Sequence, residues 1–138
     1  MKVFLDTNIL LDVLVERDNK EFTENATTIL GLGSNRVVDL YMSVLSVTTI
    51  AYVLRKMTAD RKKDIIKDLI SIVKVLPSLP EHIDNMLECQ MKDIEDDLQV
   101  QSAKEGQCDI IVTRNIPDFK DAGLPVISPE DFLKKIIK

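Results

Sequence analysis

The chain has 138 residues, of which 45% are hydrophobic and 4% aromatic, and its formal net charge is −5. This length is typical of one compact domain, and no linker-like stretch divides it, so we expect a single domain over residues 1–138. The negative charge argues against a basic surface that coats nucleic acid, but it leaves nucleic acid open as a substrate. No signal-peptide core precedes the first strand, and the apolar run 9–15 is broken by Asp12 and too short to cross a membrane. We therefore expect a cytoplasmic protein that has no membrane partner.

Short apolar runs alternate along the chain with segments of helical periodicity. Strands are predicted at residues 2–5, 37–43, 73–76, 109–113 and 125–127. Helices are predicted at residues 9–14, 21–32, 44–57, 60–73, 81–91, 94–105 and from 129 onward. This alternation predicts an α/β fold, a three-layer α/β/α sandwich around a four- to five-stranded, mainly parallel sheet.

Polar residues and glycines predict several helix ends. Gly31 and Gly33 are expected to end the second helix. Ser43 or Ser46 is expected to start the third, because serine is a favoured N-cap residue. Ser128, followed by a proline and two acids, is expected to open the last helix.

Carboxylates follow two of the predicted strands. In a parallel sheet, the loops that leave the carboxyl ends of the strands carry the site. Asp6 comes directly after the first strand, although an aspartate there also makes a good helix cap. Asp118 lies in the loop after the strand 109–113, where it can equally be an ordinary turn aspartate beside Pro117.

A third acidic group stands at the start of the helix predicted over residues 94–105. Its members are Asp93, Glu95, Asp96 and Asp97. The helix dipole explains one or two acids in a first turn, but four are more than it requires. Asp96 shares a stripe with Val100 and Ala103 that should face the sheet, so it is the acid best placed at the sheet edge. Asp93 and Asp97 come next, and Glu95 is expected to point toward solvent.

Several other polar residues are expected to lie outside the site. Gln99 and Ser102 share the side of their helix that is expected to face solvent. His82 is expected on the surface. Cys89 and Cys108 lie far apart without metal-binding spacing, so we expect two reduced, buried thiols.

Three carboxylates at one sheet edge call for a cation. Two such groups about 5 Å apart, at an effective dielectric of about 20, repel each other by roughly 3 kcal/mol. Three of them would take up protons or bind a cation. Carboxylate oxygens suit a hard ion such as Mg²⁺ or Mn²⁺, whereas a single histidine and no cysteine cluster disfavour zinc. The sequence therefore predicts a metal site formed by Asp6, Asp96 and Asp118.

Three segments, in order, resemble the PIN-domain family. They are FLDTNILLD at residues 4–12, DIEDDLQ at 93–99 and IVTRNIPDF at 111–119. The segment PVISPEDFL at 125–133 also resembles the branch that includes toxin ribonucleases of the VapC type. The resemblance covers essentially the whole chain and implies a small PIN-like α/β/α nuclease. Such a nuclease cleaves RNA phosphodiesters with one or two Mg²⁺ or Mn²⁺ ions.

The resemblance assigns roles to individual residues. Asp6, Asp96 and Asp118 match acidic positions of the family's metal site, where they would be both catalytic residues and metal ligands. Thr7 and Asn8 match the small polar residues that support this site, and they would orient ligands or metal-bound water.

Two departures from the family pattern are expected to weaken the site. Many relatives carry Glu where this chain has Thr49, and Asp where it has Asn115. These two losses would remove up to two negative charges and lower the metal affinity. Asp93, Glu95 or Asp97 would then have to compensate.

The leading hypothesis from the sequence is a metal-dependent endoribonuclease. The ion would polarise a phosphate oxygen and lower the pKa of an attacking water. Asn115 would donate a hydrogen bond to a phosphate. Arg114, Arg55 and Lys56 are candidates for contacts with the RNA backbone, although a basic run such as 55–67 is more commonly a solvated helix face. The family resemblance adds a small antitoxin partner and a homodimer formed through helices.

Two other interpretations are possible. A PIN-like module could bind Mg²⁺ or RNA with little or no nuclease activity, and four or more acids converging on one point would favour catalysis over this alternative. A receiver-like signalling domain would need an aspartate at the end of a middle strand and a lysine after a late one. The strand 37–43 does not end in Asp, and Ser128 follows the last strand, so the receiver interpretation is disfavoured.

Overall fold

The computed structural model describes residues 1–15, 17–89, 91 and 93–137. Within these residues, the strands form one sheet in the order β3-β2-β1-β4-β5, with all neighbouring pairs parallel. The strands are β1 (Lys2–Leu5), β2 (Asp39–Ser43), β3 (Val73–Leu76), β4 (Ile110–Val112) and β5 (Val126–Ile127). The predicted parallel sheet is confirmed, with β1 at its centre: Val3 pairs with Leu40 on one side and with Ile110 on the other.

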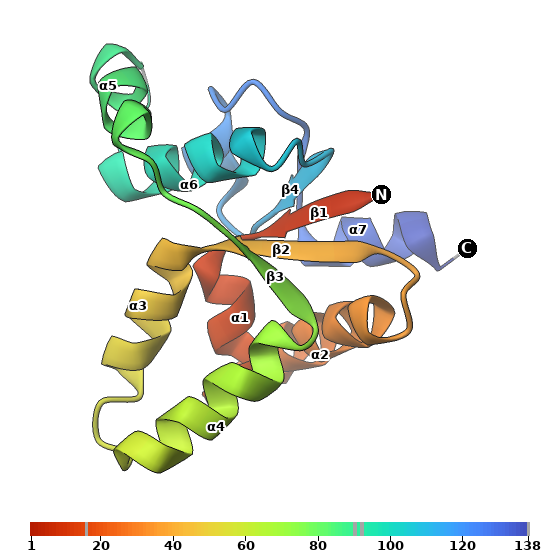
Figure 1. Cartoon of the computed structure of the whole chain (residues 1–138). Helices are drawn as coiled ribbons and strands as arrows, with labels where there is room; N and C mark the ends of the chain where they lie inside the picture. The colour runs from red at the N-terminus through yellow and green to blue at the C-terminus, as the bar shows by residue number, and fades with distance from the viewer. Residues whose placement is uncertain (16, 90, 92, 138) are drawn as a thin grey trace.

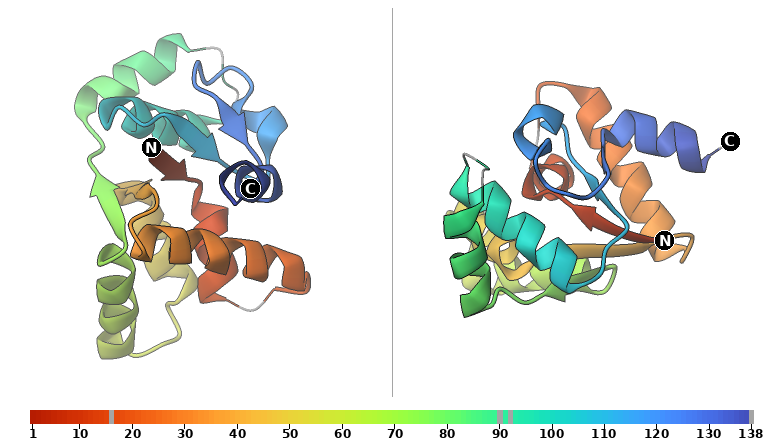
Figure 2. Two further views of the ribbon diagram at one scale, coloured as in Figure 1. Left: turned by 90° about the vertical axis from the view of Figure 1, so that its right-hand side faces the viewer. Right: turned by 90° about the horizontal axis from the view of Figure 1, so that it is seen from above.

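Helices cover both faces of this sheet. They are α1 (Thr7–Leu14), α2 (Lys20–Ser34), α3 (Val44–Val53), α4 (Ala59–Ile70), α5 (Pro80–Glu88), α6 (Ile94–Glu105) and α7 (Pro129–Ile136). A 3₁₀ turn, η1 (Ile116–Phe119), follows β4 in the segment expected as a loop. Figures 1 and 2 show α1 to α4 on one side of the sheet and α5 and α6 together on the other. The predicted three-layer α/β/α architecture is confirmed.

The central strand explains why the core has two parts. Side chains of a strand alternate between the two faces, so Val3 and Leu5 point to one side and Phe4 to the other. The first part of the core adds residues of α1, α2, α3 and α7: Ile9, Leu10, Ala26, Ile29, Ile50 and Phe132. The second adds residues of β4, α6 and the segment after β4: Ile111, Val100, Ala103 and Phe119. Burial on both faces accounts for the unbroken apolar runs in the strand sequences.

Several predicted boundaries shift in the structure. Helix α2 does not end at its glycines but continues through Gly31 and Gly33 to Ser34. At Gly33, a Cβ atom would lie 2.4 Å from Leu40 Cδ1, so this glycine allows close packing of α2 on β2. The left-handed position after the helix is taken by Arg36, with φ 60°.

The other helix ends follow their caps. Helix α3 starts at Ser43, whose hydroxyl accepts from Ser46 N–H at 3.3 Å, but it ends at Val53, short of residue 57. Helix α4 ends at residue 70 and α5 at residue 88. The helix predicted over residues 81–91 includes residue 90, which lies outside the described residues. Ser128 caps α7 as predicted and accepts from Asp131 N–H at 3.1 Å.

His82 is buried, and the prediction that it lies on the surface is wrong. It is 3% exposed. Its Nδ1 accepts a 3.0 Å hydrogen bond from Leu79 N–H, so the imidazole caps the first turn of α5 instead of facing water. Both thiols are free as expected, Cys108 buried and Cys89 half-buried. No helix in the described ranges has the length and apolar character needed to span a bilayer.

Candidate functional site

Asp6 lies at the carboxyl end of the central strand and is 3% exposed. It occupies the N-cap position of α1 but makes no side-chain capping bond; Ile9 N–H donates to its backbone carbonyl instead, at 3.0 Å. The Asp6 carboxylate accepts from Thr113 Oγ1 at 2.8 Å and, more weakly, from Gln99 Nε2 at 3.5 Å. Helix capping therefore does not explain this aspartate.

A buried polar network surrounds Asp6. Gln99 Nε2 also donates to Thr7 Oγ1 at 3.0 Å, and the Thr7 and Ser46 hydroxyls lie 2.7 Å apart. Ser46 Oγ in turn donates to Gln99 Oε1 at 3.4 Å. These residues come from α1, α3 and α6, so one amide connects three helices at the carboxylate. Asn8, in the first turn of α1, is half-buried.

The buried position of Gln99 corrects the sequence-based expectation that it faces solvent. Gln99 is 2% exposed and Ser102 is fully buried, whereas Glu95 is exposed as predicted. The expectation assumed that only the sheet covers α6. In the structure, α1 and α3 cover Gln99 through Thr7 and Ser46. The helix α5 and the chain leaving β3 also pack on α6, where Ser102 Oγ donates to the carbonyl of Pro77 at 3.0 Å.

Asp96 is the acid whose protonation is most strongly perturbed. Its pKa is raised to about 7, first by burial and then by the negative charges of Asp93, Asp6, Asp118 and Glu95. Four other carboxylates therefore lie close enough to Asp96 at this sheet edge for their charges to act on it. Asp93 also caps α6, because its Oδ1 accepts from Asp96 N–H at 2.9 Å.

Asp6 carries the same kind of perturbation. Burial raises the pKa of its carboxyl group, and the charge of Glu95 adds to the rise. The hydrogen bonds from Thr113 and from Thr7 N–H lower this pKa, as does the charge of Arg114. Neutral donors and one arginine therefore offset only part of the cost of the buried charge.

The acids lie near one another but do not form a complete set of metal ligands. Among the described residues, no group of three or more His, Cys, Asp or Glu side chains is arranged to hold an ion. Asp118 is exposed in η1, and Asp97 is buried, with Oδ1 accepting from Gln101 Nε2 at 3.3 Å. The oxygen donors and their uncompensated charge suit a hard divalent cation, which would draw the carboxylates together.

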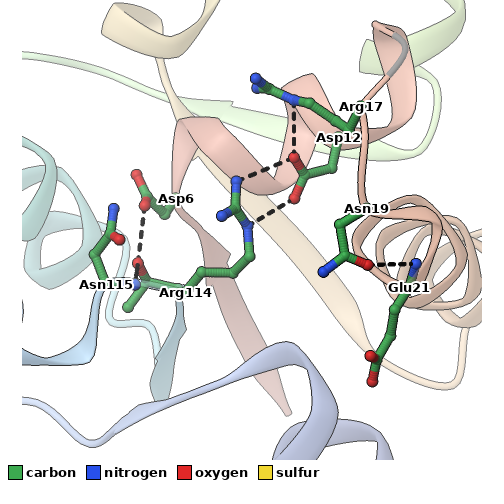
Figure 3. Close-up of polar contacts among 8 residues, drawn as sticks. Asp6, Asp12, Arg17, Asn19, Glu21, Arg114 and Asn115 are labelled. Carbon is green, nitrogen blue, oxygen red and sulfur yellow. Dashed lines mark hydrogen bonds and ion pairs between the residues drawn. The ribbon is translucent and has the colours of Figure 1, made fainter.

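The two departures from the family pattern are neutral side chains in the structure. The half-buried Thr49 donates its hydroxyl to Leu45 O at 3.1 Å, within α3. Asn115 is exposed, and Figure 3 shows its amide beside Asp6. The Asn115 N–H donates to Thr113 Oγ1 at 3.0 Å, so this residue connects to Asp6 through one hydroxyl.

Arg114 forms an ion pair with the buried Asp12. Its Nε and Nη2 donate to the two Asp12 oxygens at 2.9 and 3.1 Å, and Arg17 Nε lies 3.1 Å from the same carboxylate (Figure 3). The guanidinium also stacks on Phe22, 4.0 Å from the ring centre. Arg114 thus ties the segment after β4 to α1 and α2. The only signal in the sequence was Asp12, an acid that interrupts an apolar helical stripe.

Arg55 and Lys56 do not reach this site. Both are exposed beyond the far end of α3, which begins at Ser43 beside the sheet edge and runs away from it for ten residues, about 15 Å (Figure 1). Arg55 donates to Tyr52 O at 3.1 Å and lies over the Tyr52 ring at 4.4 Å. These two residues therefore do not contact the acids themselves, and their contact with the RNA backbone farther along a bound strand stays a prediction.

Comparison with known proteins identifies the fold and its family. A model of the PIN domain matches residues 2–117. The chain belongs to the PIN-domain family. This PIN domain is 29% identical over 140 residues to Ribonuclease VapC1 of Aquifex aeolicus (strain VF5), with 97% of this chain and 94% of that protein covered. The resemblance to VapC-type toxin ribonucleases inferred from the three motifs is confirmed.

Solved structures share the architecture of this PIN domain. VapBC2 from Rickettsia felis, bound to a DNA fragment from its promoter, superimposes with a TM-score of 0.69 at 17% identity, covering 93% of this chain and 98% of that one. DNA-bound VapBC from Salmonella typhimurium gives a TM-score of 0.68 at 18% identity, covering 94% and 98%. At these identities the likeness shows the fold, and the PIN-like α/β/α fold is confirmed.

Proposed function

We propose that this PIN domain, a single domain over residues 1–138, is a metal-dependent endoribonuclease and the toxin of a toxin–antitoxin pair. The observation that carries the proposal is the position of Asp6 and Asp96. Both are carboxyl groups with raised pKa values at the carboxyl edge of a parallel sheet, where such folds place their sites. Asp118 and Glu95 add further negative charge there. The similarity to Ribonuclease VapC1 supports RNA as the substrate.

The residues of this site divide into ligands and supports. Asp6, Asp96 and Asp118 would bind Mg²⁺ or Mn²⁺, which would polarise a phosphate oxygen and provide an activated water. Thr113 and Gln99 fix the orientation of the Asp6 carboxylate through hydrogen bonds. The Asn115 amide, exposed beside Asp6, would donate to a phosphate oxygen.

A small antitoxin protein is the partner we propose. A shallow groove of about 240 Å³ between α1, α2 and α4 is lined mostly by apolar side chains: Val13, Leu14, Leu30, Ile65, Leu69 and Ile72. A groove of this kind suits the apolar face of a short helix. One solved structure that shares this fold is described as a toxin–antitoxin complex from Klebsiella pneumoniae, which supports the same kind of partner here. We also propose a homodimer formed through helices, by analogy with this family.

A module that binds Mg²⁺ or RNA with little turnover is the second candidate. Thr49 and Asn115 favour it, because each is neutral where many relatives carry an acid. The arrangement of the acids also favours this candidate, since no three acids in the described part of the chain already form a ligand set.

RNA cleavage distinguishes the two candidates. Purified wild-type protein is expected to cleave structured RNA with Mg²⁺ or Mn²⁺ and to stop when EDTA is added. Asp96→Asn is expected to lower the rate about a hundredfold or more, as does the loss of one electrostatic stabiliser in other hydrolytic sites. Asp84→Asn, an exposed change on α5, is the control and should leave the rate unchanged. Activity that survives both Asp96→Asn and EDTA would refute the proposal.

A further inference from the structure

A separate cavity adjoins the acidic site. It has a volume of about 280 Å³ and lies where the start of α2, the segment after β4 and the start of α7 meet. Its lining includes Arg114 and Asn115, which also border the carboxylates, together with Phe22, Asn25 and Glu21 from α2. The hydrogen bonds Asn115 N–H to Thr113 and Thr113 to Asp6 connect the two places directly. A group bound in the cavity would therefore sit next to a phosphate held at Asp6.

The walls of this cavity are stiff. Arg114 is anchored by two hydrogen bonds to the fully buried Asp12, and its guanidinium plane is stacked on Phe22. This anchoring uses Nε and Nη2, which leaves Nη1 outside the ion pair. The first turn of α2 is fixed by Asn19, which accepts from Glu21 N–H at 2.9 Å (Figure 3). A ligand would thus meet a guanidinium group that is already oriented.

The chemistry of the lining selects the kind of ligand. Glu21 and Glu130 at the rim carry negative charge, which disfavours a phosphate in the cavity itself. The guanidinium carbon of Arg114 lies over the Phe22 ring, 4.0 Å from its centre, and bases of single-stranded RNA stack on aromatic rings and on guanidinium groups. The Asn115 amide and Arg114 Nη1 supply donors, and Glu21 supplies an acceptor. The volume fits one small ring system better than a larger ligand.

We propose that this cavity binds the base of the nucleotide next to the scissile phosphate, and that it prefers guanine. Guanine alone among the RNA bases offers two neighbouring N–H donors to a carboxylate together with the O6 and N7 acceptors that arginine and amide groups bind. Glu21 would accept from the N1–H and N2–H donors, and Arg114 and Asn115 would donate to the neighbouring O6 and N7 acceptors. The inference rests on RNA being the substrate of the acidic site.

The test measures binding without cleavage. In EDTA, 5′-GMP titrated at millimolar concentration is expected to shift the side-chain amide NMR signals of Asn25 and Asn115 to saturation, whereas AMP, CMP and UMP shift them several-fold less. Glu21→Gln is expected to weaken GMP binding about tenfold, the low end for one bidentate base contact. Glu24→Gln, one turn along α2 and outside this cavity, is the matched control and should bind GMP like the wild type.

A second measurement separates this inference from the proposed function. Sequencing the ends of RNA fragments should show G enriched at one position beside the cut, and Glu21→Gln should remove that enrichment. Cleavage without any G preference, or equal shifts from all four nucleotides, would overturn the pocket assignment and leave the nuclease intact. Saturable GMP binding in a protein that does not cleave RNA would support the pocket and contradict the nuclease.

Discussion

Neutral donors bind both oxygens of the Asp6 carboxylate, and they leave its negative charge uncancelled. A hydroxyl and an amide stabilise a buried carboxylate without cancelling its charge, so the negative potential stays available to a cation. Arg114, the cation whose charge acts on Asp6, is paired with Asp12 instead. At the scale of single residues, the site is therefore a set of acids that the protein orients but does not neutralise.

The pH dependence of stability should report this unneutralised charge. The Asp96 carboxyl has a folded-state pKa of about 7 against 3.8 in the unfolded chain, so the native state binds more protons between these values. Its contribution to stability is fully present below about pH 4 and is lost as the pH rises through about 7. In EDTA, the Tm of the wild type should therefore fall between pH 5 and pH 8.

Asp96→Asn isolates this contribution. The variant cannot ionise at this position, so its Tm should fall less over the same pH range and should exceed that of the wild type at pH 8. Asp84→Asn serves as the control for removal of an exposed acid. Differential scanning calorimetry provides the measurement. Parallel pH profiles for Asp96→Asn and the wild type would show that Asp96 is not the perturbed group.

Gln99 offers a second test at the residue scale. In Gln99→Glu, a carboxylate oxygen would replace the amide that donates to Asp6 Oδ1 at 3.5 Å. Two charges about 4 Å apart repel by roughly 4 kcal/mol at an effective dielectric of about 20. The metal-free variant should therefore be less stable, and Mg²⁺ should raise its Tm by more than it raises that of the wild type.

Thermal melts with and without Mg²⁺ check the Gln99 prediction, with the exposed change Gln107→Glu as the control. An equal effect of Mg²⁺ on the wild type and on Gln99→Glu would place Gln99 outside the ion's reach. This residue also shows what the sequence could not predict. A helical stripe places residues relative to one covering layer, whereas Gln99 is also covered by α1 and α3, where it contacts Thr7 and Ser46.

At the scale of elements, the segment after β4 is fixed by an ion pair between residues 102 positions apart in the chain. Arg114 and Asp12 tie η1, and with it Asp118, to α1. The sequence identified the loop, Asp118 and the strand before it, because each has local signals. It did not identify the Arg114–Asp12 pair, because side-chain pairing over such a separation leaves no local pattern.

Asp12→Ala should test this tie. Removing the carboxylate leaves Arg114 and Arg17 without their partner, and breaking a buried pair in this way costs about 3 kcal/mol of unfolding free energy. Urea denaturation measures the loss, and hydrogen exchange of residues 114–119 should speed up because η1 is released. Glu130→Gln, which breaks the exposed pair with Lys134, is the control and should change little. An Asp12→Ala protein as stable as this control would contradict the anchoring role.

At the scale of the whole molecule, the order β3-β2-β1-β4-β5 explains why distant acids meet. The strands β1 and β4 are neighbours, so the segments that follow them, with Asp6 and Asp118, leave the same edge. Helix α6 packs across this sheet with its acidic first turn at that edge. The alternation of strands and helices was enough to predict a shared edge for these acids. Their separations depend on side-chain packing, which no pattern in the sequence specifies.

The central claim is that Asp6, Asp96 and Asp118 form one site for a divalent cation. Isothermal titration of Mg²⁺ into the metal-free protein tests it most directly, with Asp6→Asn as the variant and Asp84→Asn as the control. Measurable, saturable heat is expected for the wild type and the control, and none for Asp6→Asn. Binding to Asp6→Asn with the affinity of the wild type would contradict the claim.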